Sequence, residues 1–448
     1  MSVSPREVTY YTLRNIDALP QFGLLSPEEQ WALRVVGQVL PFRVNSYVVD
    51  ELIDWTRVPD DPMFQLTFMQ RGMLSEAHFS LVSEALRREA PRAERDRIVR
   101  AIRAELNPHP AGQMTANVPE LDNEPVPGLQ HKYRETCLVF PRNGQTCHSY
   151  CTFCFRWPQF VGGADLRFAT DQARRFLDYL AEHREITDVL LTGGDPMIMS
   201  ARNLAVYIEP LLGPGYEHIQ TIRIGTKSLT YWPYRFLSDA DADDVLRLFE
   251  KVTAAGKHLA LMAHFNHWKE SDTPAAQEAI RRVRGTGAQI RTQSPLVRHI
   301  NDDPDVWQRM WKDQVRLGCV PYYMFVERDT GSKTHFSVPL ARAYTIFQGA
   351  YQRVSGLART VRGPSMSTFW GKVVIEGTTM LNDERVFVLS YIQAREADRV
   401  RRPFFARFDP EATWFTQLKP VAGSERLFPS RPAHRGSADV VPGGTFVN

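Results

Sequence analysis

The sequence has few cysteines, no long apolar run and no excess of one charge. Only 5 of its 448 residues are Cys, and we expect free thiols in a reducing compartment rather than disulfides. No apolar segment approaches the roughly 20 residues of a membrane helix, and the first residues lack a signal-peptide pattern. Lys and Arg number 54 against 51 Asp and Glu, a net charge of +3, so no basic surface for nucleic acid or membrane is indicated. These absences predict a cytoplasmic globular protein without a nucleic-acid or membrane partner.

Three of the cysteines lie within eight residues, at Cys147, Cys151 and Cys154, with CxxxCxxC spacing. The other two, Cys137 and Cys319, belong to apolar segments, which is typical of core cysteines. A closed structural zinc site would need a fourth ligand. Three thiolates instead favour a four-iron cluster, in which the iron without a protein thiolate can take an exogenous ligand.

From residue 135 onward, short apolar strands alternate with amphipathic helices, which is typical of βα units around a parallel sheet. The expected strands are Thr136–Phe140, Thr187–Leu191, Thr221–Ile224, His258–His264, Ala288–Thr292 and Val320–Val326. Polar residues follow each of them. In βα barrels the chemistry lies at the carboxyl ends of the strands, so six polar strand ends predict one shared site.

We predict an α/β fold with a partial (βα)6 TIM-like barrel. Its expected divisions are a helical N-terminal domain with a wrapping linker at 1–130, the partial barrel at 131–337, a cofactor and substrate segment at 338–425, and a mobile tail at 426–448. In the third division we expect a helix over 338–356 and strands over 359–362, 371–377 and 385–391, with a turn at Asn382 and Asp383.

With these residues in view, the chain resembles the lysine 2,3-aminomutase family of radical S-adenosylmethionine (SAM) enzymes. The resemblance runs from about Leu40 to Tyr391. It is carried by these segments in this order: Glu124–Tyr133, the cysteine loop, Leu190–Asp195, Arg223–Gly225, His264–His267 and Gln293–Ser294. It implies a radical SAM barrel, a 4Fe-4S cluster, SAM, and pyridoxal 5′-phosphate (PLP) as a further cofactor.

The resemblance also implies which residues hold the cluster and SAM. Cys147, Cys151 and Cys154 match the cluster ligands, and SAM binds the open iron. One electron then splits SAM to give a 5′-deoxyadenosyl radical. The positions that match SAM-binding residues are Phe153, beside adenine, Gly193 and Gly194, whose lack of a side chain permits close approach, and Asp195, Thr226, Lys227, His264 and Gln293.

For PLP, the resemblance points to Lys372, which falls sixteen residues after a Ser-Gly pair, as the PLP-binding lysine of the family does. Lys132 and Tyr133 match an Arg-Tyr pair that contacts the phosphate, although Lys is a point charge where Arg offers two parallel donors. The family's glycine run before the lysine is replaced by bulkier residues, including Phe369 and Trp370, which could fill the space for PLP. Lys372 could then be an ordinary exposed lysine of a hairpin.

For the substrate, Arg156 matches the arginine that binds the substrate carboxylate. Two aspartates that recognise the side-chain ammonium in lysine enzymes fall at Arg328 and Ser365, so an anionic or hydrogen-bonding side chain, such as that of glutamate, is expected. A shift of one residue would restore an aspartate at Asp329. The family's C-terminal zinc cysteines are absent, so no structural zinc is expected.

Three functions follow as hypotheses. The first is an aminomutase, an isomerase in which PLP assists 1,2-amino migration on a non-lysine amino acid. The second is a radical SAM enzyme on the same scaffold that lacks PLP and performs another rearrangement, an elimination or a dehydrogenation. The third is an iron–sulfur electron carrier or sensor. The expected partners are a small-molecule substrate and an electron donor such as flavodoxin or ferredoxin, and a homo-oligomer is possible.

Overall fold

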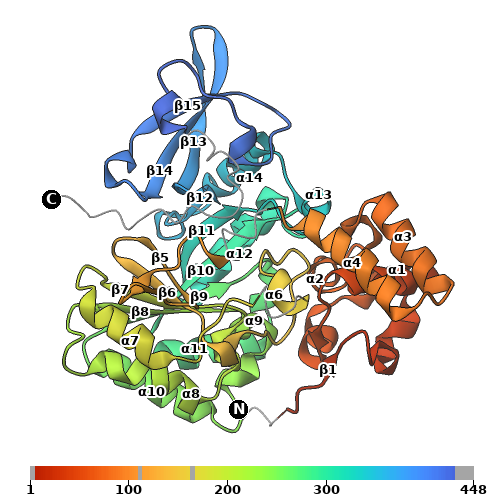
Figure 1. The fold of residues 1–448 in the computed structure, drawn as a ribbon, viewed down its shortest axis with the longest axis horizontal. Helices are drawn as coiled ribbons and strands as arrows, with labels where there is room; N and C mark the ends of the chain where they lie inside the picture. Colours follow the sequence, from red (N-terminus) through yellow and green to blue (C-terminus); the bar gives the residue numbers. More distant parts are fainter. Residues whose placement is uncertain (1–5, 109–113, 162–166, 429–448) are drawn as a thin grey trace.

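The computed structural model describes residues 6–108, 114–161 and 167–428. At its centre is an 11-stranded sheet in the order β15-β14-β13-β12-β11-β10-β9-β8-β7-β6-β5 (Figure 1). Its strands are β5 (Leu129–Tyr133), β6 (Thr136–Val139), β7 (Asp188–Leu191), β8 (Thr221–Thr226), β9 (His258–His264), β10 (Gln289–Leu296), β11 (Val320–Val326), β12 (Arg362–Ser367), β13 (Gly371–Leu381), β14 (Glu384–Ala394) and β15 (Pro403–Arg407).

The middle of this sheet is parallel. Strands β6 to β12 pair in parallel with their neighbours, and the pairings at the two ends, β5 with β6 and β12 through β15, are antiparallel. The α/β class and the six expected strands are confirmed, each within a few residues of its predicted bounds. Because parallel neighbours present their carboxyl ends at one edge, the polar residues that end or follow these strands share that edge. Gln293 and Ser294, expected after their strand, lie within β10, which is longer than predicted. Curvature into a partial barrel stays a prediction.

Amphipathic helices connect the parallel strands. They are α7 (Ala173–Glu182), α8 (Ala201–Ile208), α10 (Ala242–Ala254), α11 (Pro274–Gly285), α12 (Pro304–Arg316) and α14 (Leu340–Tyr351). Of these, α10 buries Val245, Leu248, Phe249 and Val252, the stripe that the period of 3.6 residues predicts. These side chains belong to one apolar core with the strands, which also contains the buried Cys137 and Cys319 as expected of core cysteines.

The N-terminal part is helical and packs on the loops at the carboxyl ends of the strands. It contains α1 (Pro27–Val39), α2 (Pro62–Thr67), α3 (Glu76–Arg87) and α4 (Arg92–Leu106), and these helices lie together at one side of the sheet in Figure 1. Ser26 and Glu29 form the capping box that begins α1. The apolar core of the N-terminal part also includes three aromatic residues from the segments that follow the strands, Trp157, Trp232 and Phe336. Whether residues 1–130 form a separate domain stays a prediction.

The C-terminal strands differ from expectation at several points. The strand expected at 359–362 begins only at Arg362, because a 3-10 turn at Gly356–Ala358 precedes it. The helix expected over 338–356 is shorter, Leu340–Tyr351, and β5 and β15 were not expected. Asn382 and Asp383 form the predicted turn, both with positive φ (49° and 62°). Most of the predicted tail, 429–448, lies outside the described residues.

Short elements complete the architecture. They are β1 (Tyr10–Tyr11), β2 (Val44–Asn45), β3 (Glu120–Leu121), β4 (Glu124–Pro125), α6 (Pro158–Val161), α9 (Ser228–Tyr231) and α13 (Lys333–Phe336). In the part of the chain that the structure describes, no helix combines the length and the apolar composition needed to cross a membrane.

Candidate active site

The three-cysteine loop follows β6 and carries free thiols. Cys147, Cys151 and Cys154 are each half-buried. Burial raises the pKa of all three thiols, and that of Cys147 is raised further by Asp195 and by the other two cysteines. The three thiols thus influence one another electrostatically within one loop.

These thiols fit an iron–sulfur cluster. In the described residues, no group of three His, Cys, Asp or Glu side chains is close enough to hold a single metal ion. An iron–sulfur cluster does not require the three sulfur atoms to meet at one ion, because each thiolate binds a different iron. A bound cluster would also lower the thiol pKa values that burial raises, since its irons stabilise thiolates.

The N-terminal part holds this loop by hydrogen bonds. The buried Asn45 side chain donates to the carbonyl oxygens of His148 (3.2 Å) and Tyr231 (2.8 Å), and the Thr152 hydroxyl donates to the Gln65 carbonyl (2.8 Å). The support of the cysteine loop by Asn45 and Gln65 was not predicted from the sequence. These two residues are separated from the loop by about a hundred positions, and no local pattern marks them.

The glycines after β7 lie against the start of the cysteine loop. A Cβ on Gly194 would come within 2.5 Å of the Thr146 carbonyl oxygen, and Gly193 has a φ of +140°. The Asp195 amide donates to the same Thr146 oxygen (2.7 Å). Glycine is therefore needed here for backbone packing between two loops, and the predicted contact of these glycines with SAM stays a prediction.

Asp195 joins the ends of β7 and β8. Its carboxylate accepts hydrogen bonds from the Thr226 hydroxyl (2.7 Å), the Lys227 amide (2.8 Å), the Ser228 hydroxyl (3.0 Å) and the Met197 amide (3.0 Å). Burial raises its pKa, while these hydrogen bonds oppose the rise. Asp195 and Thr226, predicted to bind SAM, thus hold the strand ends together in this structure.

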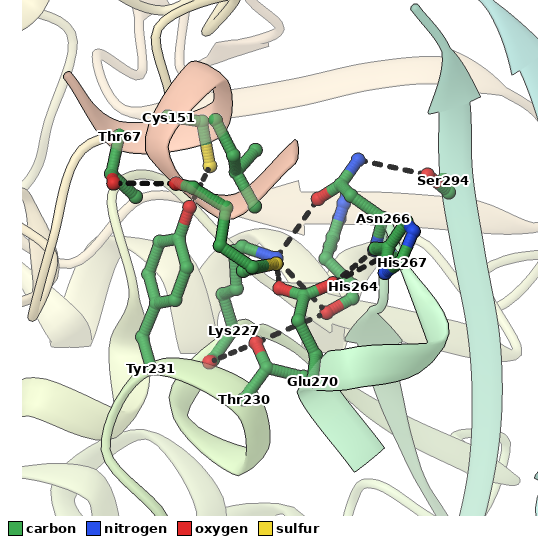
Figure 2. Close-up of polar contacts among 12 residues, drawn as sticks. Thr67, Cys151, Lys227, Thr230, Tyr231, His264, Asn266, His267, Glu270 and Ser294 are labelled. Carbon is green, nitrogen blue, oxygen red and sulfur yellow. Dashed lines mark hydrogen bonds and ion pairs between the residues drawn. The ribbon is translucent and has the colours of Figure 1, made fainter. Parts of the chain in front are cut away.

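Lys227 is the centre of a buried polar network (Figure 2). Its ammonium forms an ion pair with Glu270 and donates to Asn266 Oδ1 (2.9 Å). Glu270, which is fully buried, also accepts from the amides of Asn266 and His267. The Lys227 ammonium lies 4.3 Å from the Tyr231 ring centre, and the Tyr231 hydroxyl lies 3.2 Å from Cys151 Sγ. Glu270 was missed in the sequence because a lone Glu in a turn carries no motif.

His264, the last residue of β9, and Gln293, within β10, contact each other directly. Gln293 Nε2 lies 2.8 Å from His264 Nε2. Burial lowers the pKa of His264 to about 3, and the nearby Lys227 adds to this. The imidazole is therefore neutral and can accept a hydrogen bond from the Gln293 amide. A role for the pair in SAM binding stays a prediction.

Arg156 and Arg328 lie on the same aromatic ring. Their guanidinium carbons are 5.1 Å and 5.3 Å from the Phe155 ring centre, and Arg156 also lies 4.4 Å from Phe140. Burial lowers the pKa of Arg156 to about 10 and also lowers that of Arg328. Phe153, by contrast, packs edge-on against Phe336. The structure thus brings the two predicted substrate residues together beside the cysteine loop.

Lys372, near the start of β13, is half-buried rather than an exposed hairpin lysine. Its ammonium lies 4.1 Å from the Tyr323 ring centre and 5.2 Å from that of Phe325. Burial lowers its pKa to about 7, and Arg362, Arg223 and Lys132 lower it further. A lysine with a pKa of about 7 is about half neutral at pH 7, and the neutral amine is the nucleophile for a carbonyl cofactor.

Lys132 and Tyr133, at the end of β5, lie near the same group of cations. The Lys132 ammonium donates to the Thr368 carbonyl, and burial lowers its pKa to about 7, with Arg395 and Arg328 adding to the effect. Burial raises the pKa of Tyr133, against the effect of the same two arginines. Arg395 was missed because it lies just after β14, far along the chain.

Phe369 and Trp370, the bulky residues before Lys372, each have partners elsewhere in the structure. Phe369 is 47% exposed, and Arg395 lies over its ring at 4.5 Å. Trp370 packs against the apolar cluster of the C-terminal strands, which includes Val373, Phe387 and Tyr391. A half-buried amine surrounded by cations fits PLP, whose phosphate is an anion.

Comparison with known proteins identifies relatives of this chain. The chain is 37% identical over 291 residues to a "Putative L-lysine 2,3-aminomutase" of Aquifex aeolicus, covering 65% of this chain and 74% of that protein. It is 30% identical over 239 residues to the "L-lysine 2,3-aminomutase" of Fusobacterium nucleatum, covering 53% of each. No protein-family model matches. The solved structure of Streptococcus suis SuiB bound to its precursor peptide SuiA matches with a TM-score of 0.38 and 11% identity, over 60% of this chain and 54% of that one, which is too weak to assign a fold.

The extent of the Aquifex match, together with the order of the motifs, establishes the relationship. The chain is an enzyme and belongs to the lysine 2,3-aminomutase family of radical SAM enzymes, whose cofactors are a 4Fe-4S cluster, SAM and PLP.

Proposed function

We propose that this enzyme catalyses PLP-assisted 1,2-amino migration on an amino acid other than lysine, with an acidic side chain as the best match. The observation that carries the proposal is the gathering of Lys132, Arg156, Arg328, Lys372 and Arg395 near the carboxyl ends of the strands. A site with this many cations suits a phosphate and two carboxylates, and it disfavours a substrate ammonium.

Each group has a task in this proposal. Cys147, Cys151 and Cys154 hold the cluster, and Lys372 holds PLP, with Lys132 and Tyr133 at its phosphate. When bound, the cluster and SAM supply the radical that removes hydrogen, and PLP supplies the π-system that delocalises it. Flavodoxin or ferredoxin would be the electron donor.

Arg156 and Arg328 divide substrate recognition between them. Arg156 binds the α-carboxylate, because a guanidinium can form two parallel hydrogen bonds with a carboxylate. Arg328, which lies 5.3 Å from the centre of the same Phe155 ring, faces the substrate side chain. The loops around the cluster exclude water, which protects a radical from quenching.

The test uses protein purified anaerobically with PLP. We expect a visible absorption band from bound PLP that is absent in Lys372→Ala, and 5′-deoxyadenosine release with SAM, reductant and glutamate that exceeds the release with lysine. Arg328→Asp should shift this preference toward lysine, whereas Arg309→Asp, on the outer helix α12, should not. A wild type without the PLP band would instead support the PLP-free radical enzyme, and unchanged selectivity in Arg328→Asp would remove Arg328 from the site.

A further inference from the structure

A cavity of about 310 Å³ lies beyond the carboxyl end of β11. Its walls are the loop after β11, the helix α13 and the C-terminal segment 413–417. The charged side chains that line it are Glu327, Arg328, Asp329 and Lys333. This volume lies at the lower end of the range for small-ligand sites.

Glu327 is the unusual member of this lining. Its side chain is only 7% exposed, and its Oε2 atom is buried with no hydrogen-bond partner in the described parts of the chain. Leaving a buried carboxyl oxygen without a partner costs free energy. Glu327 lines the cavity and therefore retains hydrogen-bonding capacity that the described parts of the chain do not use.

The charges around Glu327 determine whether the cavity favours an anionic or a cationic ligand. Burial raises the pKa of Glu327 well above its usual value, although Arg298 and Lys333 oppose the rise. A protonated carboxyl group donates a hydrogen bond, as a carboxylate cannot. Besides Glu327, the charged side chains of the lining are the two cations Arg328 and Lys333 and the single anion Asp329.

The cavity shares one residue, Arg328, with the proposed active site. Arg328 lines the cavity and at the same time lies 5.3 Å from the Phe155 ring centre, the ring that Arg156 also contacts at 5.1 Å. Arg328 is therefore the residue through which a substrate bound at Arg156 would reach the cavity.

We propose that this cavity holds the distal carboxylate of an acidic amino-acid substrate, and that the Glu327 carboxyl group donates a hydrogen bond to it beside Arg328 and Lys333. The inference rests on the proposed function and adds Glu327 as a specificity-determining residue. Glu327 would then act as a donor to an anion rather than as a carboxylate that binds an ammonium group.

The experiment is calorimetric titration of the anaerobically purified holoprotein with glutarate, an acyclic dicarboxylate, and with 1,5-diaminopentane as its cationic counterpart. We expect glutarate to bind and the diamine not to bind. Glu327→Gln keeps an uncharged donor, so its dissociation constant for glutarate should stay within about threefold of wild type. Glu327→Leu removes the donor and should weaken binding about tenfold.

The matched control is Glu411→Gln, an exposed position outside the cavity in the C-terminal region, which should leave glutarate binding unchanged. If Glu327→Leu does not fold, Lys333→Met replaces it, with an expected weakening of about threefold. Binding of the diamine by wild type with its loss in Glu327→Gln would overturn the proposal, as would glutarate binding that none of these changes affects. Glutarate lacks an amino group and does not react with PLP, so this outcome is independent of the PLP band that tests the proposed function.

Discussion

Lys227 and Glu270 form a buried ion pair that connects the end of β8 to the turn after β9. The side chains are 9% and 0% exposed, and Glu270 also accepts hydrogen bonds from two backbone amides. The pair lies beside Tyr231, whose hydroxyl contacts Cys151. It therefore couples the strand ends to the cysteine loop.

Glu270→Gln should strongly destabilise the protein. It leaves the Lys227 ammonium buried without a countercharge, which costs about 3–5 kcal/mol in comparable cases. The measurement is the free energy of unfolding in urea under anaerobic conditions. The control is Glu209→Gln, because Glu209 pairs with Lys251 at side-chain exposures of 46% and 63%, and its loss should cost less than about 1 kcal/mol. Equal effects of the two changes would contradict a structural role for the buried pair.

Gly194→Ala should prevent correct closure of the cysteine loop. The added Cβ would lie 2.5 Å from the Thr146 carbonyl oxygen, and backbone atoms must move to relieve this contact. We expect the iron and sulfide content per chain to fall by more than half, with a lower melting temperature. Gly285→Ala in α11 is the control, since its Cβ would meet nothing within 4 Å. Normal iron content in Gly194→Ala would show that the loops adjust freely.

Asn45→Ala should weaken the support of the cysteine loop from the N-terminal part. The change leaves the His148 and Tyr231 carbonyl oxygens without this donor, at about 1–3 kcal/mol for each unsatisfied buried group. Urea unfolding and iron content measure the effect. Asn15→Ala is the matched change, because Asn15 donates to the Tyr10 carbonyl at an exposed position, and it should cost under about 1 kcal/mol. A cluster content unaffected by Asn45→Ala would separate the N-terminal part from cluster binding.

The reactivity of Lys372 should depend on pH with a midpoint at about 7, because burial and the nearby Arg362, Arg223 and Lys132 lower its pKa. Only the neutral amine reacts with acetic anhydride, so acetylation of Lys372 in protein without PLP should rise as pH increases through this value. Peptide mass spectrometry measures the rate. Lys132→Met removes one cation and should move the midpoint upward, whereas Lys251→Met on α10 should not. A midpoint near 10 in wild type would show that Lys372 is solvated like an ordinary lysine.

Much of the fold could be predicted from local sequence. Strands such as His258–His264 and Val320–Val326 are short apolar runs bounded by polar residues, and they were placed at their observed bounds. The turn at Asn382 and Asp383 and the cap of α1 at Ser26 depend on a few neighbouring residues. The edge strands β5 and β15 were missed, because their pairing depends on partners rather than on an apolar pattern.

The candidate site was predicted less completely. The family resemblance supplied the positions that face the carboxyl ends of the strands, and the structure brings Arg156 and Arg328 onto one ring. It did not supply Glu270, Asn45 or Arg395. Each of these residues forms a hydrogen bond with, or changes the pKa of, a residue distant in the sequence. Such a contact cannot be predicted from the types of neighbouring residues.

The sequence by itself determined the cysteine spacing, the βα alternation and the family, because these depend on residue type and on separations along the chain. Only the tertiary structure decided that Lys372 is half-buried among cations and that Phe369 is exposed. It also decided that Glu327 has an orphaned oxygen in a cavity wall. Burial and electrostatic environment arise from segments that meet only in the folded chain, and these control pKa and specificity.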